Sequence, residues 1–197
     1  MPTPTPSTKL DELVALLDTA VEEQETKGCC YAVKAALERV VHSGEDFIDP
    51  SFLKPARDSY ARRLLHKDPK GRYTALVMVW DKGQGTALHD HDNMWCVECV
   101  YRGRIKVDSY RMLSDGGDGS DRNSPVYAFE HETTVYAGPG EAGALIPPFD
   151  HHTIRNPDES SAVTIHIYGG EMTHCHVFLP VEGGYERVER TLCYTPD

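Results

Sequence analysis

Two histidines separated by a single residue, His89 and His91, constrain this chain more than any other feature of its sequence. They lie between Gly83 and Gly103, and Cys96 follows the second histidine after four intervening residues. On an extended strand alternate side chains share a face, so the two imidazoles point the same way and can hold one metal ion. The spacing therefore favours a strand that carries two metal ligands.

Length, composition and charge narrow the class of protein. The chain has 197 residues, a length that suits one domain with a sizeable core. Its net charge of -11 argues against nucleic acid or an anionic membrane surface as partner, since both attract basic patches. No apolar run approaches the roughly 20 residues that span a bilayer, and the start, MPTPTPST, lacks the basic and apolar regions of a secretory signal. We therefore expect a cytoplasmic protein that binds neither nucleic acid nor membranes.

The N-terminal part of the chain has a helical pattern. Residues 1–8 are rich in Pro, Thr and Ser and are predicted to be disordered, and Ser7 or Thr8 could cap the helix that follows. Apolar residues recur at helical spacing from Leu10, and again over about 31–41. A third short helix is predicted over about 50–65.

After residue 71 the pattern changes to short β-type runs broken by turn residues. The Asp- and Gly-rich stretch 114–124 is predicted to be an exposed loop. Many short strands after a few helices predict a closed or sandwiched antiparallel sheet, of which the jelly-roll barrel is one form. The expected organisation is one domain over 9–197, in which helices within about 9–65 pack on a barrel of about 72–197.

A second histidine segment, Pro147–Asn156, contains His151 and His152. Together the two segments resemble the paired motifs of the cupin superfamily, Gly-x5-His-x-His-x(3,4)-Glu-x6-Gly and a motif ending in His-x3-Asn. The resemblance implies a mainly β, cupin-type jelly-roll barrel with a short N-terminal helical segment. It also implies that His152, four residues before Asn156, is the third metal ligand, and that His151 is a rim residue. Histidine ligands by themselves suit iron, copper, nickel or zinc.

Cys96 stands where that superfamily motif has its glutamate. Three histidines with a cysteine at this position resemble the thiol dioxygenases, and the cysteine dioxygenase family most closely, over roughly residues 60–194. The resemblance implies ferrous iron, Fe(2+), held by His89, His91 and His152, and a possible thioether cross-link between Cys96 and Tyr168. A buried free thiol near a tyrosine is the alternative to the cross-link. The implied reaction adds both atoms of O2 to a small carboxylate-bearing thiol, as in L-cysteine to cysteine sulfinate.

The segment Thr164-Ile165-His166-Ile167-Tyr168 alternates polar and apolar residues, so Thr164, His166 and Tyr168 share one face of a strand. Such a face can simply be exposed to water. The family, however, places a hydroxyl residue, a histidine and a tyrosine here beside its iron, which implies a catalytic relay in which His166 orients the phenol. The segment from Tyr60 to Leu65 also resembles the family, and implies that Arg62 forms a bidentate contact with the substrate carboxylate while Tyr60 adds a hydrogen bond.

Three points stay open at the level of sequence. Glu98 lies two residues after Cys96 and so on the same face, as a carboxylate neighbour of the metal, in a salt bridge, or at a position deeper in the barrel. Cys96 and Cys99 would point to opposite faces of a strand, which argues against a zinc knuckle. An ungapped comparison with the family puts Arg190 by the substrate amine, where a cation would favour mercaptosuccinate or 3-mercaptopropionate over cysteine.

A different metal-dependent cupin enzyme and a non-catalytic cupin that binds a small ligand are the alternative functions.

Overall fold

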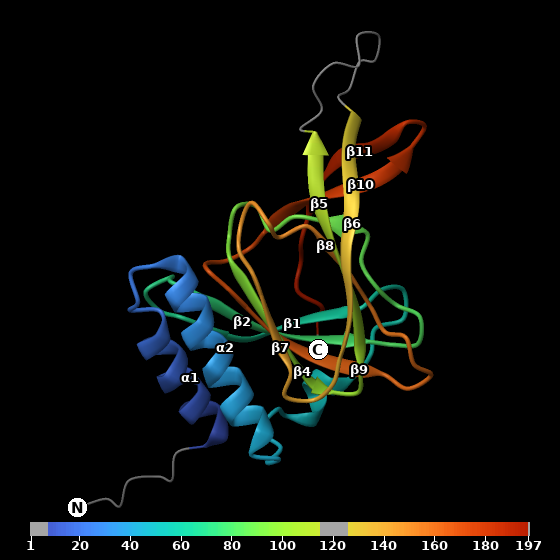
Figure 1. The fold of residues 1–197 in the computed structure, drawn as a ribbon. Coiled ribbons are helices and arrows are strands. Elements are labelled where there is room, and N and C mark those ends of the chain that lie inside the picture. Colours follow the sequence, from blue (N-terminus) through green and yellow to red (C-terminus); the bar gives the residue numbers. More distant parts are fainter. Residues whose placement is uncertain (1–7, 115–125, 197) are drawn as a thin grey trace, which may run out of the picture.

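The computed structural model describes residues 8–114 and 126–196 and shows two helices beside a mainly β body (Figure 1). The helices are α1 (Lys9–Ala20) and α2 (Thr26–His42), followed by the short 3-10 helix η1 (Pro50–Leu53). Thr8 forms a capping box at the start of α1, since its side chain accepts from the Asp11 N–H and the Asp11 carboxylate accepts from the Thr8 N–H. Of the two expected caps, the structure therefore has Thr8. Of the stretches predicted to be disordered (1–8) or looped (114–124), residues 1–7 and 115–124 lie outside the described residues.

The β body of the described residues consists of eleven strands. In chain order they are β1 (Ala61–Lys67), β2 (Thr74–Trp80), β3 (Leu88–His89), β4 (Cys96–Arg102), β5 (Ile105–Ser114), β6 (Val126–Ala137), β7 (Ala142–Leu145), β8 (His152–Arg155), β9 (Ala162–Tyr168), β10 (His174–Val181) and β11 (Gly184–Thr191). They form a five-stranded sheet of order β1-β2-β9-β4-β7 and a closed ring of order β10-β11-β6-β5-β8-β3, with antiparallel pairing throughout. The prediction of a mainly β, cupin-type barrel with N-terminal helices is confirmed.

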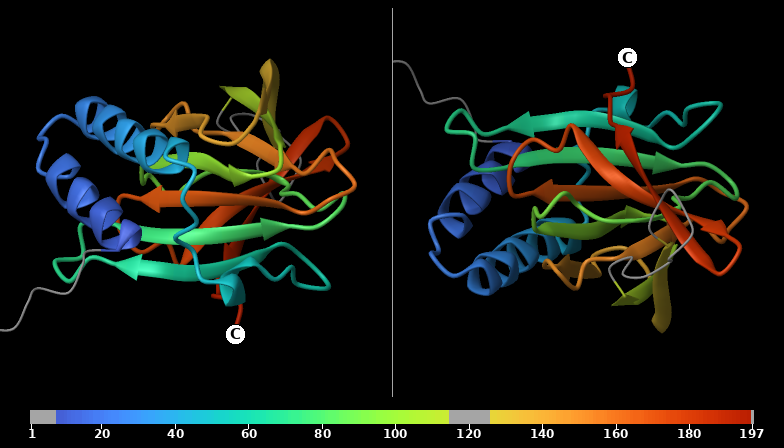
Figure 2. Two further views of the ribbon diagram at one scale, coloured as in Figure 1. Left: turned by 90° about the horizontal axis from the view of Figure 1, so that it is seen from below. Right: turned by 90° about the horizontal axis from the view of Figure 1, so that it is seen from above.

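The five-stranded sheet is the central layer of the molecule and is buried on both faces. The two helices cover its outer face (Figure 2), where Leu17 and Leu37 pack with Val77 in one core cluster. On its inner face, Leu76 and Trp80 pack with side chains of the ring in a second hydrophobic core cluster. A strand buried on both faces is apolar without alternation, which explains the run Thr-Ala-Leu-Val-Met-Val-Trp of β2.

The predicted third helix over 50–65 is wrong. Only Pro50–Leu53 is helical, and Ala61–Lys67 forms the edge strand β1, paired with β2 from Ala61 opposite Val79 to Lys67 opposite Thr74. Arg62 and Arg63 are 4% and 5% exposed, so neither lies on a solvated helix end. The ladder with β2 overrides the local helical pattern, because pairing with the next strand supplies backbone hydrogen bonds that a periodicity argument does not include. The barrel consequently begins near residue 61, earlier than the predicted 72.

The short β-type runs of the sequence include 126–129 and 133–136, which join into the single strand β6, whereas none of these runs corresponds to β8 or β11. None of the helices in the described residues is long and apolar enough to span a membrane.

We expect the helical layer to stabilise the sheet without contributing to the interior of the barrel. Replacing the fully buried Leu37 on α2 by alanine should lower the free energy of unfolding by about 2–5 kcal/mol, because it removes apolar contacts and leaves a cavity. The matched control on the same helix is Tyr31→Ala, since Tyr31 is 56% exposed and should change stability by no more than about 0.5 kcal/mol. Urea denaturation checks both values, and equal losses from the two variants would contradict this layer assignment.

Candidate metal centre

Three histidines from three segments converge inside the ring of strands. His89 ends β3 and is the direct partner of His152, the first residue of β8. His91 follows in the turn after β3, where Asp92 and Asn93 take positive φ values of 51° and 59°, a conformation that Asp and Asn tolerate better than most residues. The ligand atoms of His89, His91 and His152 all lie within 4.8 Å of one another. The structure thus brings together the three predicted metal ligands.

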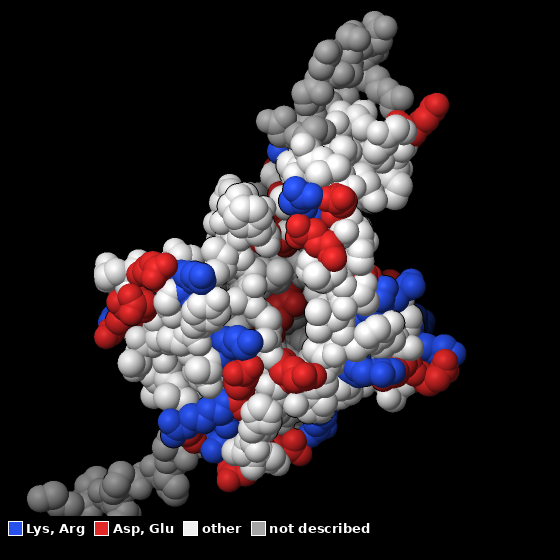
Figure 3. Space-filling view, in the orientation of Figure 1, with Lys and Arg blue, Asp and Glu red and all other residues white. Residues whose placement is uncertain are grey.

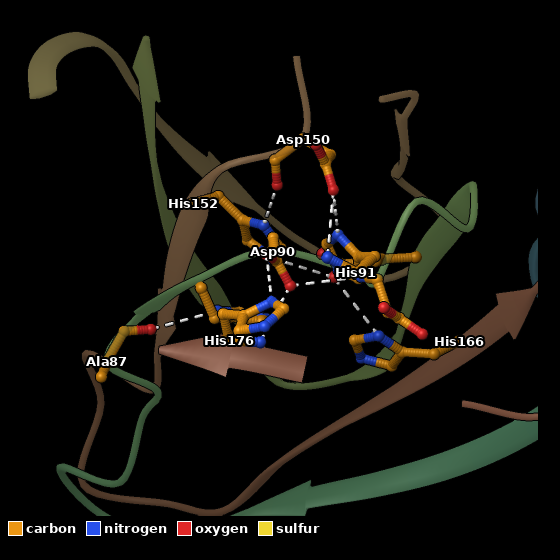
Figure 4. A network of polar contacts seen from close by, with 10 residues as sticks. Ala87, Asp90, His91, Asp150, His152, His166 and His176 are labelled. Atoms are coloured by element: carbon orange, nitrogen blue, oxygen red, sulfur yellow. Dashed lines mark hydrogen bonds and ion pairs between the residues drawn. The ribbon is translucent and has the colours of Figure 1, made fainter. Parts of the chain in front are cut away.

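Hydrogen bonds at Nδ1 determine which ring nitrogen of each histidine is available. The Nδ1 atoms of His89, His91 and His152 lie 3.1, 3.1 and 3.0 Å from the Ala87 carbonyl, an Asp150 carboxylate oxygen and the Asp150 carbonyl (Figure 4). An oxygen acceptor at Nδ1 holds the proton there and leaves a lone pair on Nε2. His91 Nε2 is buried and has no hydrogen-bond partner among the described residues. A buried acceptor without a partner is costly, and a metal ion bound at this point removes that cost. The residues present therefore fit a metal.

The electrostatics of the site also favour neutral imidazoles at two of the three positions. Burial lowers the pKa of His89 and of His91, and the neighbouring histidines lower both further, although Asp150 opposes this at His91. Burial also acts to lower the pKa of His152, but the Glu98 carboxylate outweighs it and raises that pKa. Only a neutral imidazole can bind a metal, so His89 and His91 are held in the ligand form.

Two aspartates hold the ligand segments in place, and sequence analysis did not identify either one. Asp150 accepts from the His91 backbone N–H at 3.0 Å as well as from its ring. Asp90 lies between the two histidines of β3 and the turn, and its carboxylate contacts the backbone N–H and the Nδ1 of His176, each at 2.9 Å. His176, on strand β10, therefore holds the segment between His89 and His91 through its contacts with Asp90. Its partner is 86 residues away in the sequence, and no local pattern could have indicated the contact.

Cys96 and Tyr168 are direct partners across β4 and β9, and both are buried. Burial, and then the Glu98 carboxylate, raise the pKa of the Cys96 thiol well above its usual value, although a hydrogen bond with Tyr168 opposes them. Burial, and then the neighbouring Cys96, raise the pKa of Tyr168. The Tyr168 ring centroid is 6.0 Å from that of His91, so the pair borders the three histidines. Cys99 belongs to the core cluster under the helices, on the opposite face of β4 from Cys96, as expected.

The polar residues of β9 point into the barrel, as predicted, but their contacts differ from the expected relay. Thr164 Oγ1 accepts from the Trp80 indole at 2.8 Å and lies 2.7 Å from His166 Nε2. The rings of His166 and Tyr168 stack with centroids 6.1 Å apart, and no hydrogen bond joins them in the part of the chain that the structure describes. His166 Nδ1 faces Glu98 instead, at 3.3 Å from Oε1.

Glu98, left open by the sequence, points toward the histidines. It is 7% exposed, and its Oε1 lies 3.2 Å from His152 Nε2. Burial acts to raise the pKa of Glu98, but His152 and His166 outweigh it and hold that pKa well below its usual value. The carboxylate is thus an ionised neighbour of the three-histidine group.

A small cavity of about 20 Å³ adjoins the site and contains most of the predicted substrate-binding residues. It is lined by Tyr60, Arg62, Met78, Trp80, Thr86, His89, Glu98, Ile154, His166, Tyr168, Met172, Cys175 and Leu192. Arg62 donates from Nη2 to the Met172 carbonyl at 2.8 Å, while its buried Nε has no hydrogen-bond partner in 8–114 or 126–196. Tyr60 stacks on Trp80 with centroids 4.5 Å apart.

Two predicted residues lie elsewhere. Arg190 is exposed on β11 and is not among the described residues that line this cavity, where Leu192 lies instead. His151 is 8% exposed and packs against Phe129 and Phe178, so it is a buried neighbour of an aromatic cluster and its predicted place on the rim is wrong. His151 directly precedes β8, and successive side chains of an extended segment point to opposite faces. His151 therefore points away from the face that His152 occupies.

The chain matches the family model described as cysteine dioxygenase type I over residues 50–179. It belongs to that family. Cysteine dioxygenase type 1 of Rattus norvegicus is 23% identical over 133 residues, which cover 67% of this chain and 62% of that protein. The enzyme of the same name from Danio rerio is 21% identical over 141 residues, which cover 71% of this chain and 66% of that protein. The match to these members of the cysteine dioxygenase family thus spans less than two thirds of their own length.

This chain is also similar to solved structures. An oxalate oxidase structure is 18% identical with a TM-score of 0.46, covering 70% of this chain and 66% of that one. A cupin 2 conserved barrel domain protein from Salinispora arenicola is 16% identical with a TM-score of 0.41, covering 63% and 86%. Family membership implies a metal cofactor, and the three-histidine group provides the residues to hold it.

Asp150 should contribute to metal affinity, because it holds His91 in its ligating orientation. We expect Asp150→Ala to weaken binding of a divalent metal by about 10- to 100-fold, measured by titration of metal-free protein against a competing chelator. Asp158→Ala is the matched control, since Asp158 forms an ion pair with Arg104 at the surface. Equal affinities for the Asp150 variant and the unmodified protein would show that Asp150 does not support metal binding.

Proposed function

We propose that this protein is a non-haem iron thiol dioxygenase that adds both atoms of O2 to a small carboxylate-bearing thiol in the cytoplasm. The observation that carries the proposal is the arrangement of three histidine Nε2 atoms around one point, beside the Cys96–Tyr168 pair and the cavity that Arg62 lines. Membership of the cysteine dioxygenase family supports it. The substrate that fits best is L-cysteine, and the product is then cysteine sulfinate.

Three imidazoles suit this chemistry because they bring no negative charge to the metal. Bound iron would supply a Lewis acid that favours the thiolate form of a substrate and a centre that reacts with O2. Burial of His91 and His152, both 0% exposed, keeps bulk water from the inner side of the site. The partly exposed His89 lies on the side of the cavity, where a substrate would enter.

Arg62 provides the contact for a substrate carboxylate. Its guanidinium is buried, and the unpaired Nε can donate to an anion in the adjoining cavity. A planar guanidinium binds a carboxylate through two parallel hydrogen bonds. Arg62 is the only lysine or arginine among the described residues that line the cavity, which favours a thiol with one carboxylate over mercaptosuccinate. The free space is small, so a substrate would have to displace the flexible side chains of Met172 and Leu192.

Tyr168 is placed to act as a hydrogen-bond donor beside the substrate. Burial raises its pKa, so the phenol keeps its proton at neutral pH. We propose that a thioether bond between Cys96 and Tyr168 holds the phenol in this position. Its formation replaces the thiol S–H and one ring C–H by a C–S bond, with O2 as the two-electron oxidant, and the direct pairing of the two residues across β4 and β9 supports it.

Metal analysis, intact mass and oxygen uptake of one purified sample test this function. We expect bound iron, a mass lower by two hydrogen atoms in the cross-linked fraction, and consumption of one O2 for each L-cysteine, with the sulfinate identified by mass spectrometry. Cys96→Ser is the control for the mass change. Iron-loaded protein that consumes no O2 with L-cysteine, 3-mercaptopropionate or mercaptosuccinate would refute the dioxygenase proposal.

Substitution of Arg62 tests carboxylate recognition. Arg62→Lys keeps the charge but removes the planar fork, and we expect KM for L-cysteine to rise roughly tenfold or more, since a charge-assisted hydrogen bond contributes about 1.5–3 kcal/mol. The matched control is Arg63→Lys, because Arg63 donates to the carbonyls of Phe52 and Lys54 and should leave KM unchanged. Cysteamine, which has no carboxylate, should react equally with all three proteins. An unchanged KM for L-cysteine in the Arg62 variant would remove Arg62 from the binding site.

A further inference from the structure

A second cavity opens into the barrel besides the one that Arg62 lines. It has a volume of about 270 Å³ and lies between β7, the last strand of the five-stranded sheet, and strands β5 and β6 of the ring. Figure 3 shows a hollow in this face of the molecule with acidic side chains inside and at its edge. Among the described residues, the two cavities share only Glu98 in their walls. The larger one, the β5–β7 cavity, is therefore a separate approach to the interior.

The walls of the β5–β7 cavity are mainly aliphatic. Its aliphatic side chains include Val100, Ile105, Val107, Val135, Ala137 and Leu145. Its charged residues are Glu98 and Glu141, and no lysine or arginine lines it within 8–114 and 126–196. A carboxylate-bearing thiol would meet like charge and no cation here, whereas a small neutral molecule meets apolar surface. The lining thus disfavours the proposed substrate and its sulfinate product.

The inner end of the β5–β7 cavity lies at the candidate metal centre. The Glu98 side chain in its wall has Oε1 at 3.2 Å from His152 Nε2. Ser109, also in its wall, is the direct partner of His152 across β5 and β8, and directly opposed residues of neighbouring strands lie on the same face. Wall residues from two different strands thus adjoin one of the three histidines. The cavity therefore ends beside the three-histidine group.

Gly143, in strand β7, leaves space on the Glu98 side of the sheet. The two residues are direct partners across β4 and β7, so a side chain at position 143 would share the face of Glu98. Beyond its chain neighbours, a Cβ atom placed on Gly143 would meet no described atom within 4 Å, and Gly143 does not have the positive φ that favours glycine. Neither crowding nor backbone conformation therefore requires glycine here. Glycine inside a strand weakens it and often marks a point where a ligand or another backbone approaches closely.

We infer that the β5–β7 cavity is the route by which O2 reaches the metal centre, and that Gly143 keeps this route open. The inference rests on the proposed function, whose two reactants differ in polarity, since the thiol carries a carboxylate and O2 is neutral and apolar. The cavity beside Arg62 has only about 20 Å³ of free space, which a bound thiol would fill. O2 then needs a second approach, and apolar cavities in proteins take up small neutral gases such as xenon.

Filling the cavity from position 143 tests the route. Gly143→Phe places a ring in the open space on the Glu98 face, so we expect kcat/KM for O2 to fall at least about fivefold, because O2 would enter only when side chains move apart. Gly143→Ala, which adds one methyl group, should lower it less. The value of kcat/KM for L-cysteine at saturating O2 should stay unchanged, since Gly143 does not line the cavity beside Arg62. The matched control is Val181→Phe, which introduces the same ring at an exposed strand end that lines neither cavity.

Xenon, an apolar gas whose binding needs neither metal nor turnover, gives a second measurement. In crystals of the unmodified protein under xenon pressure we expect a xenon atom in the β5–β7 cavity, and in crystals of Gly143→Phe we expect none there. Absence of xenon from this cavity in the unmodified protein, or an unchanged kcat/KM for O2 in a folded Gly143→Phe variant, would overturn the inference. If that variant does not fold, xenon binding by the unmodified protein decides.

These measurements separate the inference from the proposed function. A thiol dioxygenase that takes up no xenon in the β5–β7 cavity refutes the O2 route alone. A protein that binds xenon there but oxidises neither L-cysteine, 3-mercaptopropionate nor mercaptosuccinate refutes the proposed function, and leaves the cavity as a binding site for small apolar molecules.

Discussion

The centre of this molecule depends on hydrogen bonds that hold the outer nitrogen of each metal-binding histidine. Oxygens of Ala87 and Asp150 lie against the three Nδ1 atoms, so the three Nε2 lone pairs turn inward. Asp150 does this for two of the histidines, through its carboxylate and its backbone carbonyl. Without these contacts the rings could rotate or change tautomer, and their spacing on the strands would not by itself make a metal site.

The layered fold separates the apolar core that stabilises the molecule from the interior that carries the candidate metal site. The five-stranded sheet buries one face under the helices, and that apolar layer contains none of the polar site residues. The opposite face carries Glu98, Thr164, His166 and Tyr168 toward the histidines of the ring. Because residues two apart on β4 and β9 share that face, a polar group placed at every second position enters one common interior. The charged and titratable groups there partner one another and are shielded from water by the ring.

Much of the centre could be predicted because it follows from strand periodicity. The pair His89 and His91, and the polar side of β9, depend only on alternation, and family resemblance added His152, Cys96 and Arg62. The contacts that could not be predicted join distant segments, such as Asp90 with His176 and Arg62 with the Met172 carbonyl. Local pattern also failed for residues 61–67, where pairing with β2 turned an expected helix into a strand. The predicted position of Arg190 beside the substrate amine came from an ungapped comparison. That prediction depended on the register of its strand, which sequence alone does not specify.

By itself the sequence determined most of the classes of element, the apolar run of the central strand, the shared face of His89 and His91, and the shared face of the polar residues of β9. These properties depend on side-chain type and on a spacing of two or of three to four residues, which short segments specify. The tertiary structure alone decided that Glu98 faces His152 and His166, that Asp150 orients two ligands, and that Arg62 is buried beside the metal centre. The contacts of Glu98 with His152, of Asp150 with His91 and of Arg62 with the Met172 carbonyl join groups at least 54 residues apart at about 3 Å, and only the packing of the sheet against the ring brings them that close.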